Sequence, residues 1–248
     1  MKIKIEVCAA SVQSALTAQL AGAHRVELCS SLELGGITPS ASTIEKTREI
    51  LDIEVYVLIR PRPGDFLYTS LEFDVIKRDI LFCKNVKTYD GKKVDGVVIG
   101  VLQKDGQVDV ERTKELVELA APMKVTFHRA FDRAADPFLS LEKVIETGAH
   151  QILTSGQFAD AFEGRFFLKK LVEKAAGRIS IMPGAGVNAQ NILELAKTTQ
   201  AKEFHLSGKG EIKSKMTFEN PNFDFSENDF WETGIKNISD IFKVINYK

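Results

Sequence analysis

Two short apolar segments near the N-terminus each carry a glutamate and a cysteine two residues apart. Glu6 and Cys8 form the first pair, and Glu27 and Cys29 form the second. In a β-strand, side chains two residues apart point to the same face. If the segments are neighbouring strands, two carboxylates and two thiols meet in one small volume. That chemistry suits a metal site or an acid–base site, or it belongs to an unusual core.

Other polar residues follow apolar segments later in the chain, and several of them are charged. A buried charge without a partner costs several kcal/mol, so these groups are expected to pair with one another or to bind a ligand. They are Arg60, Arg62, His128, Arg129, Asp132, Thr154, Ser155, His205 and Ser207. The two-residue spacing recurs between Thr126 and His128 and between His205 and Ser207, which predicts that four strands contribute to one basin.

Each of these residues also has a simpler structural interpretation. A single cysteine in a strand is more often a small buried hydrophobe than a metal ligand, and His128 is alternatively a core histidine. Glu6 and Glu27 are alternatively salt-bridge partners of Arg60 and Arg129, a network that perturbs pKa values without any catalytic role. The repeated glutamate–cysteine spacing leaves both interpretations of the cysteines open, whereas the charged residues beside His128 favour a polar site.

Two glycine-containing loops form a second signal. One contains Gly184 and Gly186, and in the other Gly208 follows Ser207. Glycine allows an anion to approach the main chain closely, and many barrels hold a phosphate on backbone N–H groups at these two positions. The same residues also serve as ordinary turns, so a phosphate site is one of two interpretations.

The elements that must position these residues form a regular series of eight strand-like segments, each followed by a helical pattern. The segments are residues 3–8, 25–29, 54–60, 94–102, 124–128, 151–154, 179–182 and 203–206. Strict alternation implies parallel strands joined by right-handed crossovers. Eight units predict a closed (β/α)8 TIM barrel rather than a doubly wound sheet. Functional sites of such barrels lie at the C-terminal ends of the strands, where the polar residues are found.

The 248 residues suit one barrel over residues 1–210 and a C-terminal extension over residues 211–248. The extension contains the only tryptophan, Trp231, and is expected to pack on the barrel or at a subunit interface.

A net charge of -1 argues against nucleic acid or an anionic membrane as the main partner. No apolar run approaches the roughly 20 residues of a membrane span. Three cysteines without a disulfide pattern indicate a cytoplasmic protein with reduced thiols.

The sequence resembles the CutC family, and the likeness runs in order from residue 3 to about residue 208. The motifs that carry it are Glu6-Val7-Cys8, Arg25-Val26-Glu27-Leu28-Cys29, Gly35-Gly36-Ile37-Thr38-Pro39-Ser40, Ile59-Arg60-Pro61-Arg62, Gly64-Asp65-Phe66, Thr126-Phe127-His128-Arg129-Ala130-Phe131-Asp132, Ile152-Leu153-Thr154-Ser155-Gly156 and Met182-Pro183-Gly184-Ala185-Gly186. The resemblance implies a cytoplasmic copper homeostasis protein with a (β/α)8 barrel and a homo-oligomeric assembly. It also implies copper(I) binding at Cys8 and Cys29, although this chain has Leu58 where family members often carry methionine.

Two functional hypotheses of different classes follow. In the first, the chain handles copper and binds copper(I), its only expected cofactor, through Cys8 and Cys29. In the second, it is an enzyme acting on a small phosphorylated or carboxylated metabolite, with Glu6, Glu27 or His128 as acid or base. The residues expected to hold that ligand are Arg60, Arg62, Arg129, Asp132, Ser155, Gly184, Gly186, His205 and Ser207. A third alternative is a barrel without chemistry that acts as a scaffold through its extension.

Overall fold

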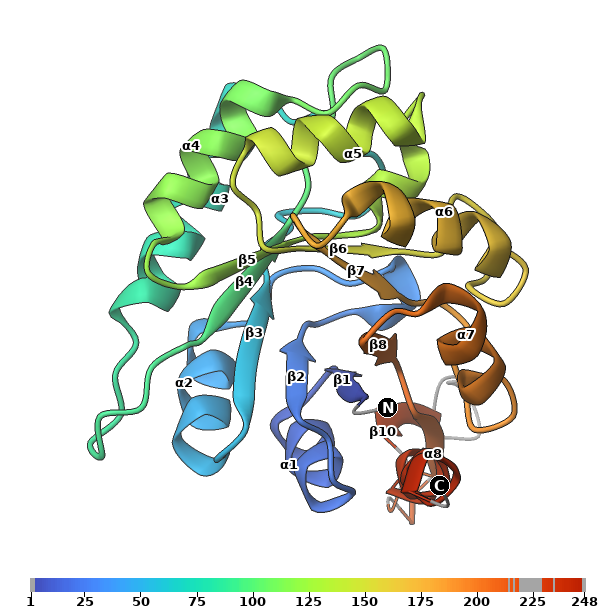
Figure 1. Cartoon of the computed structure of the whole chain (residues 1–248). Coiled ribbons are helices and arrows are strands. Elements are labelled where there is room, and N and C mark those ends of the chain that lie inside the picture. The colour runs from blue at the N-terminus through green and yellow to red at the C-terminus, as the bar shows by residue number, and fades with distance from the viewer. Residues whose placement is uncertain (1–2, 214, 216, 219–228, 234, 247–248) are drawn as a thin grey trace.

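The computed structural model describes residues 3–213, 215, 217–218, 229–233 and 235–246. Its centre is a sheet of eight parallel strands that curves into a barrel (Figure 1). The strands are β1 (Lys4–Ala9), β2 (Arg25–Leu28), β3 (Glu54–Leu58), β4 (Gly96–Ile99), β5 (Lys124–Phe127), β6 (Gln151–Thr154), β7 (Ser180–Pro183) and β8 (Glu203–Leu206). The order β7-β6-β5-β4-β3-β2-β1-β8 brings β8 back beside β1, and no ladder joins β7 to β8 in the described chain. The predicted (β/α)8 fold class is confirmed.

Helices alternate with the strands and cover the outside of the barrel (Figure 1). They are α1 (Val12–Leu20), α2 (Ala41–Ile50), α3 (Ser70–Asn85), α4 (Val110–Ala120), α5 (Pro137–Glu146), α6 (Arg165–Ala175), α7 (Ile192–Thr199) and α8 (Ile235–Asn246). Two 3-10 turns, η1 (Leu32–Leu34) and η2 (Arg129–Arg133), follow β2 and β5. Strands β9 (Lys209–Lys213) and β10 (Asp229–Thr233) form a separate antiparallel pair. Side-chain caps explain where α1 and α5 begin. Ser11 Oγ accepts the Ser14 N–H at 2.9 Å, and Asp136 caps α5, whose first residue is Pro137.

The last helix, α8, packs on the barrel between α7 and α1. Ile238 and Ile241 are buried in the main core, and the Phe242 ring lies 5.7 Å from the His24 ring, measured between centroids. This is the place of the eighth helix of a (β/α)8 barrel, although the sequence pattern assigns α8 to the extension. The domain boundary at residue 210 stays a prediction, and the Trp231 side chain lies outside the described residues.

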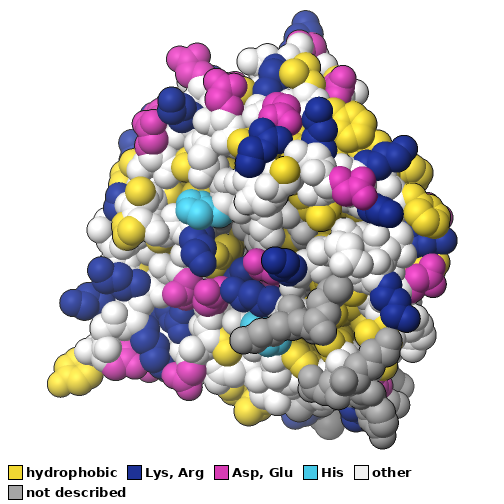
Figure 2. All heavy atoms as spheres, viewed as in Figure 1, with side chains coloured by type: hydrophobic (Ala, Val, Ile, Leu, Met, Phe, Trp, Pro, Cys, Tyr) yellow, Lys and Arg dark blue, Asp and Glu magenta, His cyan; other side chains and the backbone are white. Residues whose placement is uncertain are grey.

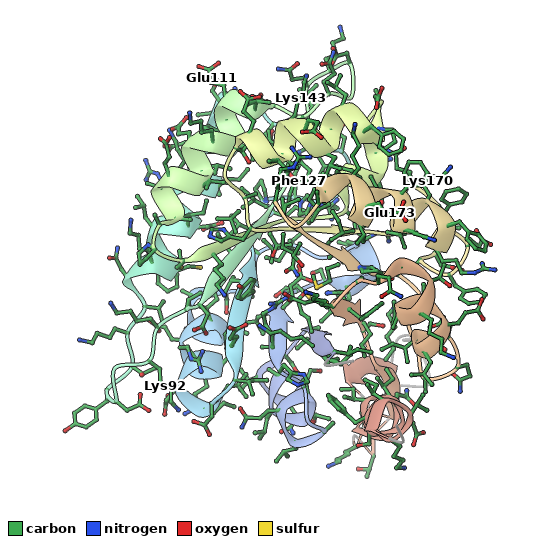
Figure 3. All side chains as sticks on the ribbon, in the orientation of Figure 1. Lys92, Glu111, Phe127, Lys143, Lys170 and Glu173 are labelled. Atoms are coloured by element: carbon green, nitrogen blue, oxygen red, sulfur yellow. The ribbon has the colours of Figure 1, made fainter. Side chains whose placement is uncertain are left out.

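Alternation along the strands separates two layers of side chains. Those facing the helices, such as Val7 and Phe127, are fully buried in the main core. Figure 3 shows Phe127 beneath the outer helices, while the labelled lysines and glutamates belong to outer elements of the barrel. Inward-facing Cys8 and Tyr56 belong to a small separate cluster. Gly96 makes room for that cluster, because a Cβ there would lie 2.7 Å from the Tyr56 ring. Of the helices described, none combines the length and apolar character needed to cross a membrane.

Candidate functional site

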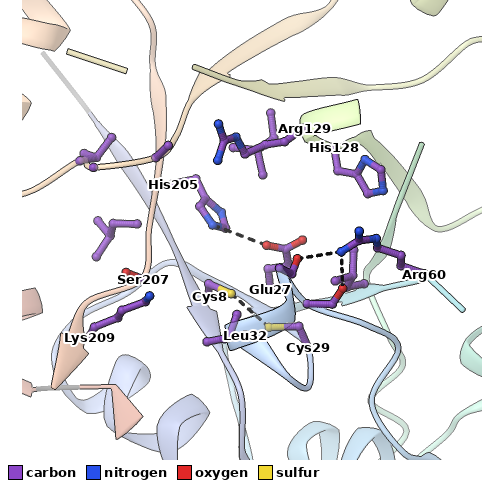
Figure 4. A pocket seen from close by; sticks show the side chains of 18 of the residues that line it. Cys8, Glu27, Cys29, Leu32, Arg60, His128, Arg129, His205, Ser207 and Lys209 are labelled. Carbon is purple, nitrogen blue, oxygen red and sulfur yellow. Dashed lines mark hydrogen bonds and ion pairs between the residues drawn. The ribbon is translucent and has the colours of Figure 1, made fainter. Parts of the chain in front are cut away.

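A cavity of about 340 Å³, here termed the basin, opens at the C-terminal ends of the strands. Figure 2 shows histidine, cationic and acidic side chains near the middle of this face, and Figure 4 shows the basin from close by. Its lining includes these residues from the predicted set: Cys8, Glu27, Cys29, Arg60, His128, Arg129, Gly186, His205 and Ser207. The other members of that set are not part of the lining: Glu6, Arg62, Asp132, Ser155 and Gly184.

The floor of the basin holds two free thiols. Cys8 lies in β1 and Cys29 directly follows β2, and their Sγ atoms are 3.1 Å apart. Strand register places them there, because Cys8 lies opposite Glu27 and the Cys29 N–H donates to the Ala9 carbonyl at 2.9 Å. The hydrogen bond with Cys29, together with burial, raises the pKa of the Cys8 thiol well above its usual range. Leu58 packs in the same apolar cluster as both cysteines.

His205 on β8 lies between two glutamates. Its Nδ1 is 2.7 Å from Glu6 Oε1, and its Nε2 is 3.5 Å from Glu27 Oε2. Burial alone would lower the pKa of His205, but hydrogen bonds with Cys8 and Glu6 and the charges of both glutamates raise it well above its usual value. Burial, partly offset by the charge of His205, raises the pKa of Glu27 to about 7. This pair can therefore hold or release a proton near neutral pH.

Beneath the basin, Arg25 on β2 compensates the charge of Glu6. Arg25 Nε donates to Glu6 Oε2, and its Nη2 lies 2.9 Å from Glu203 Oε2. Burial raises the pKa of Glu6, but the charge of Arg25 and the hydrogen bond with His205 outweigh it and lower that pKa to about 2. Glu6 is therefore a fixed anion below the basin. The alternative pairing of Glu6 with Arg60 is wrong, because Arg25 and His205 take both carboxylate oxygens.

Arg25 is not among the predicted site residues, although it begins the segment Arg25-Val26-Glu27-Leu28-Cys29. It precedes Glu27 and Cys29 by two and four residues, so the alternation rule applied to those residues also points Arg25 inward. Its guanidinium donates to Gln151 Oε1 at 2.9 Å and lies 4.5 Å from the centre of the Tyr56 ring. Arg25 therefore connects strands on opposite sides of the barrel interior.

The two arginines that follow β3 have different surroundings. Arg60 lines the basin, and its Nη1 and Nη2 donate to the carbonyls of Gly36 at 2.8 Å and Gly64 at 2.9 Å. Arg62 lies outside the basin and pairs with Asp65, with 3.0 Å between Nη2 and Oδ1. Arg60 thus holds two loops together, and the structure does not bring Arg62 to the other candidate residues.

Arg129 reaches the basin from the turn η2. Its Nε is 2.8 Å from Asp132 Oδ2, and its Nη2 donates to Ser155 Oγ at 3.2 Å. Asp132 also accepts the backbone N–H groups of Ser155 and Gln157, each at 3.1 Å. Asp132 and Ser155 therefore position the arginine without lining the basin themselves. The alternative pairing of Arg129 with Glu27 is wrong, because Asp132 is its ion-pair partner.

The two glycine loops differ in their relation to the basin. Gly186 and Ser207 line the basin and also a neighbouring cavity of about 250 Å³. Lys209 follows Gly208 in the second glycine loop and is not among the predicted site residues, but it borders both cavities. Gly184 does not line the basin, and close packing explains why a glycine stands there: a Cβ would lie 2.4 Å from Leu153 Cδ1. A phosphate on these loops stays a prediction.

His128 is a buried, neutral histidine in the wall of the basin. Its Nδ1 accepts the Ala130 N–H at 3.1 Å, which places the ring proton on Nε2. Burial, together with the charge of Arg60, lowers the pKa of His128 to about 3. An unfolded chain has a histidine pKa of about 6.5. Between these values the unfolded state binds a proton that the folded state does not, so stability falls as the pH falls.

We expect His128→Asn to weaken this pH dependence. The histidine contributes a slope of up to about 1.4 kcal/mol per pH unit below pH ~6.5, whereas asparagine accepts the Ala130 N–H without taking up a proton. Urea unfolding at several pH values between about 4 and 7 measures the difference. His150→Asn is the comparison variant, because His150 accepts the Val125 N–H in the same way but is exposed. Burial and the charge of Lys124 also lower the pKa of His150, so this variant should change the pH dependence in the same direction but by less. Parallel stability curves for wild type and His128→Asn would contradict the expectation.

The chain is similar to known proteins over most of its length. A model of the CutC family matches residues 3–210, a range that contains every lining residue of the basin. A CutC family protein from Chromobacterium violaceum is 48% identical over 214 residues, which cover 86% of this chain and 84% of that protein. A CutC family protein from Parabacteroides distasonis is 48% identical over 223 residues, which cover 90% and 89%.

Solved structures share the same architecture. A CutC protein from Streptococcus agalactiae, proposed to act in copper homeostasis, matches with a TM-score of 0.77 and 32% identity, covering 83% of this chain and 98% of its own. Phosphoribosylanthranilate isomerase from Thermotoga maritima matches with a TM-score of 0.59 and 11% identity, covering 99% and 100%. At that identity the second likeness shows the barrel fold alone.

Proposed function

The chain belongs to the CutC family, and we propose that it binds copper(I) through Cys8 and Cys29 on the floor of its basin. The observation that supports this most is the pair of free thiols, 3.1 Å apart, beside a cavity that a ligand can enter. Copper(I) prefers soft sulfur ligands. The donor set fits the ion, because both thiols lie in an apolar cluster with Leu58 and neither forms a disulfide.

We expect the Cys8→Ser/Cys29→Ser double variant to bind copper(I) at least about tenfold more weakly than wild type, because hydroxyl oxygens are poor ligands for a soft ion. Competition with a copper(I) chelator under anaerobic, reducing conditions measures the affinity. Cys83→Ser is the matched control, since Cys83 is an equally buried free thiol on α3 outside the basin. Equal affinities of the double variant and wild type would rule out these two ligands.

A second candidate function is catalysis on a small phosphorylated or carboxylated metabolite. The charge around the basin favours it, because Arg129 and Lys209 line the cavity together with the Glu27–His205 pair. An anion held by the cations would lie beside groups that exchange protons. Native mass spectrometry of protein purified without chelators tests both functions at once, since a retained metabolite and a retained copper ion differ in mass.

We also infer a cytoplasmic location and a homo-oligomeric assembly. Three free cysteines, all buried and reduced, support the location. Exposed apolar side chains such as Phe158 and Phe166 support the assembly, because another subunit could cover them. Light scattering coupled to size-exclusion chromatography measures the assembly directly.

A further inference from the structure

A second set of ligand atoms lies beside the thiol pair. One ligand atom from each of Cys8, Glu27 and His205 lies within 4.8 Å of the other two. The three residues come from adjacent strands, because β1 pairs with β2 on one side and with β8 on the other. All three line the basin, and Figure 4 shows His205 and Glu27 directed toward one another beside Cys8. A sulfur, an oxygen and a nitrogen ligand therefore converge at one point.

The ring of His205 is oriented by residues below the basin. Its Nδ1 is 2.7 Å from Glu6, and Arg25 in turn holds Glu6, so Nε2 faces Glu27. Metal-binding histidines almost always carry such a partner on the second ring nitrogen, because it fixes the tautomer and the ring plane. Glu6 lies outside the basin lining, so it supplies this support without occupying a ligand position.

The charge of Glu27 is less well compensated than that of Glu6. Glu6 has ion pairs with both Arg25 and His205. Among the described residues, no lysine or arginine lies within ion-pair distance of Glu27. Its ion-pair partner among those residues is His205, at 3.5 Å. Both carboxylates are buried, and a buried carboxylate is costly unless a cation compensates it. The side of the basin next to Glu27 therefore favours a bound cation.

We propose that Cys8, Glu27 and His205 form a site for a divalent cation of the zinc class. Zinc accepts thiolate, carboxylate and imidazole ligands together, whereas copper(I) favours sulfur. Ligand atoms at about 2.0–2.3 Å from one ion lie roughly 3–4 Å apart, so atoms already within 4.8 Å need only small side-chain rotations. Three protein ligands beside an open cavity leave a fourth position for water or substrate, which is the arrangement of catalytic zinc sites.

The zinc site goes beyond the proposed copper(I) function and does not depend on it. Both sites use Cys8, but the zinc site uses Glu27 and His205 where the copper site uses Cys29. The two ions therefore compete for one thiol, and single substitutions separate them. A bound zinc ion would polarise an oxygen atom of a small substrate in the same cavity that Arg129 lines.

The experiment measures Zn²⁺ and copper(I) affinities of the full chain by chelator competition, with circular dichroism to verify that each variant is folded. Glu27→Gln keeps the shape of the side chain and removes its charge. It is expected to weaken Zn²⁺ binding about 10–100-fold while leaving copper(I) binding within about threefold of wild type. Cys29→Ser is expected to do the reverse, and Cys8→Ser is expected to weaken both.

Cobalt(II) supplies a second readout as a spectroscopic substitute for zinc. A thiolate-to-cobalt absorption band is expected in wild type and in Cys29→Ser, and its loss is expected in Cys8→Ser. Wild-type Zn²⁺ affinity in Glu27→Gln would overturn the site, as would a Zn²⁺ loss in Cys29→Ser equal to that in Cys8→Ser. Unchanged copper(I) affinity in Cys29→Ser would instead contradict the proposed copper function. This outcome is separate from the two Zn²⁺ results that would overturn the zinc site.

Discussion

Replacing Arg25 with methionine is expected to lower the free energy of unfolding by about 3–5 kcal/mol. Arg25 and Glu6 are 3% and 1% exposed, and Arg25 also lies 2.9 Å from Glu203. Methionine fills similar space but leaves the Glu6 carboxylate in the barrel interior with only His205 beside it. The cost is large because the Glu6 carboxylate stays buried after losing one of its two cationic partners. Urea unfolding at neutral pH, followed by circular dichroism, measures the change.

Two further variants identify the cause of that loss. Arg78→Met is the matched control, since Arg78 pairs with Asp74 on the exposed face of α3 and its removal should cost less than about 0.5 kcal/mol. Adding Glu6→Gln to Arg25→Met removes the buried carboxylate charge and should recover about 1–3 kcal/mol. If the double variant is less stable than Arg25→Met alone, the buried charge is not the reason for the loss.

Replacing Asp132 with alanine is expected to cost about 2–4 kcal/mol. The Asp132 carboxylate accepts the N–H groups of Ser155 and Gln157 and pairs with Arg129 at 2.8 Å. Alanine leaves those two amides without their charged acceptor and releases Arg129 from its position at the basin. Denaturant unfolding measures the stability, and the affinity for small anions reports the loss of Arg129 positioning.

The control for Asp132 is an exposed aspartate that also accepts a backbone N–H group. Asp105 accepts the N–H of Gln107 at 3.0 Å in an exposed loop. Asp105→Ala should cost no more than about 1 kcal/mol, because water replaces the lost acceptor. A similar loss of stability for Asp105→Ala and Asp132→Ala would show that the buried network around Arg129 does not carry the effect.

Much of the fold and the inward face of each strand followed from local rules. Apolar segments that alternate with helical patterns identify the barrel, and the period of two in a strand directs Cys8, Glu27 and His205 toward one interior. The structure places all three in the lining of one basin. The same rule also points Arg25 into the barrel interior, but an arginine at the start of a strand does not suggest chemistry until its partner is known.

The ion pairs could not be predicted in the same way. Glu6 lies directly opposite Arg25 in the register of β1 against β2, and this brings their side chains together. The sequence suggested Arg60 as the partner because Arg60 is another inward-facing cation. Register depends on how all the strands tilt and stagger as the barrel closes, so it is not contained in the pattern of either strand.

Arg60 and Arg62 show where the local rule ends. They are two residues apart, but β3 ends at Leu58, so alternation no longer relates them. Arg60 turns to the carbonyls of Gly36 and Gly64, and Arg62 turns outward to Asp65. The sequence by itself determined the barrel, the strands and the residues that face its interior, because these depend on neighbours along the chain. Only the tertiary structure decided which charges meet, because those contacts depend on strand register and on loops folding over the strand ends.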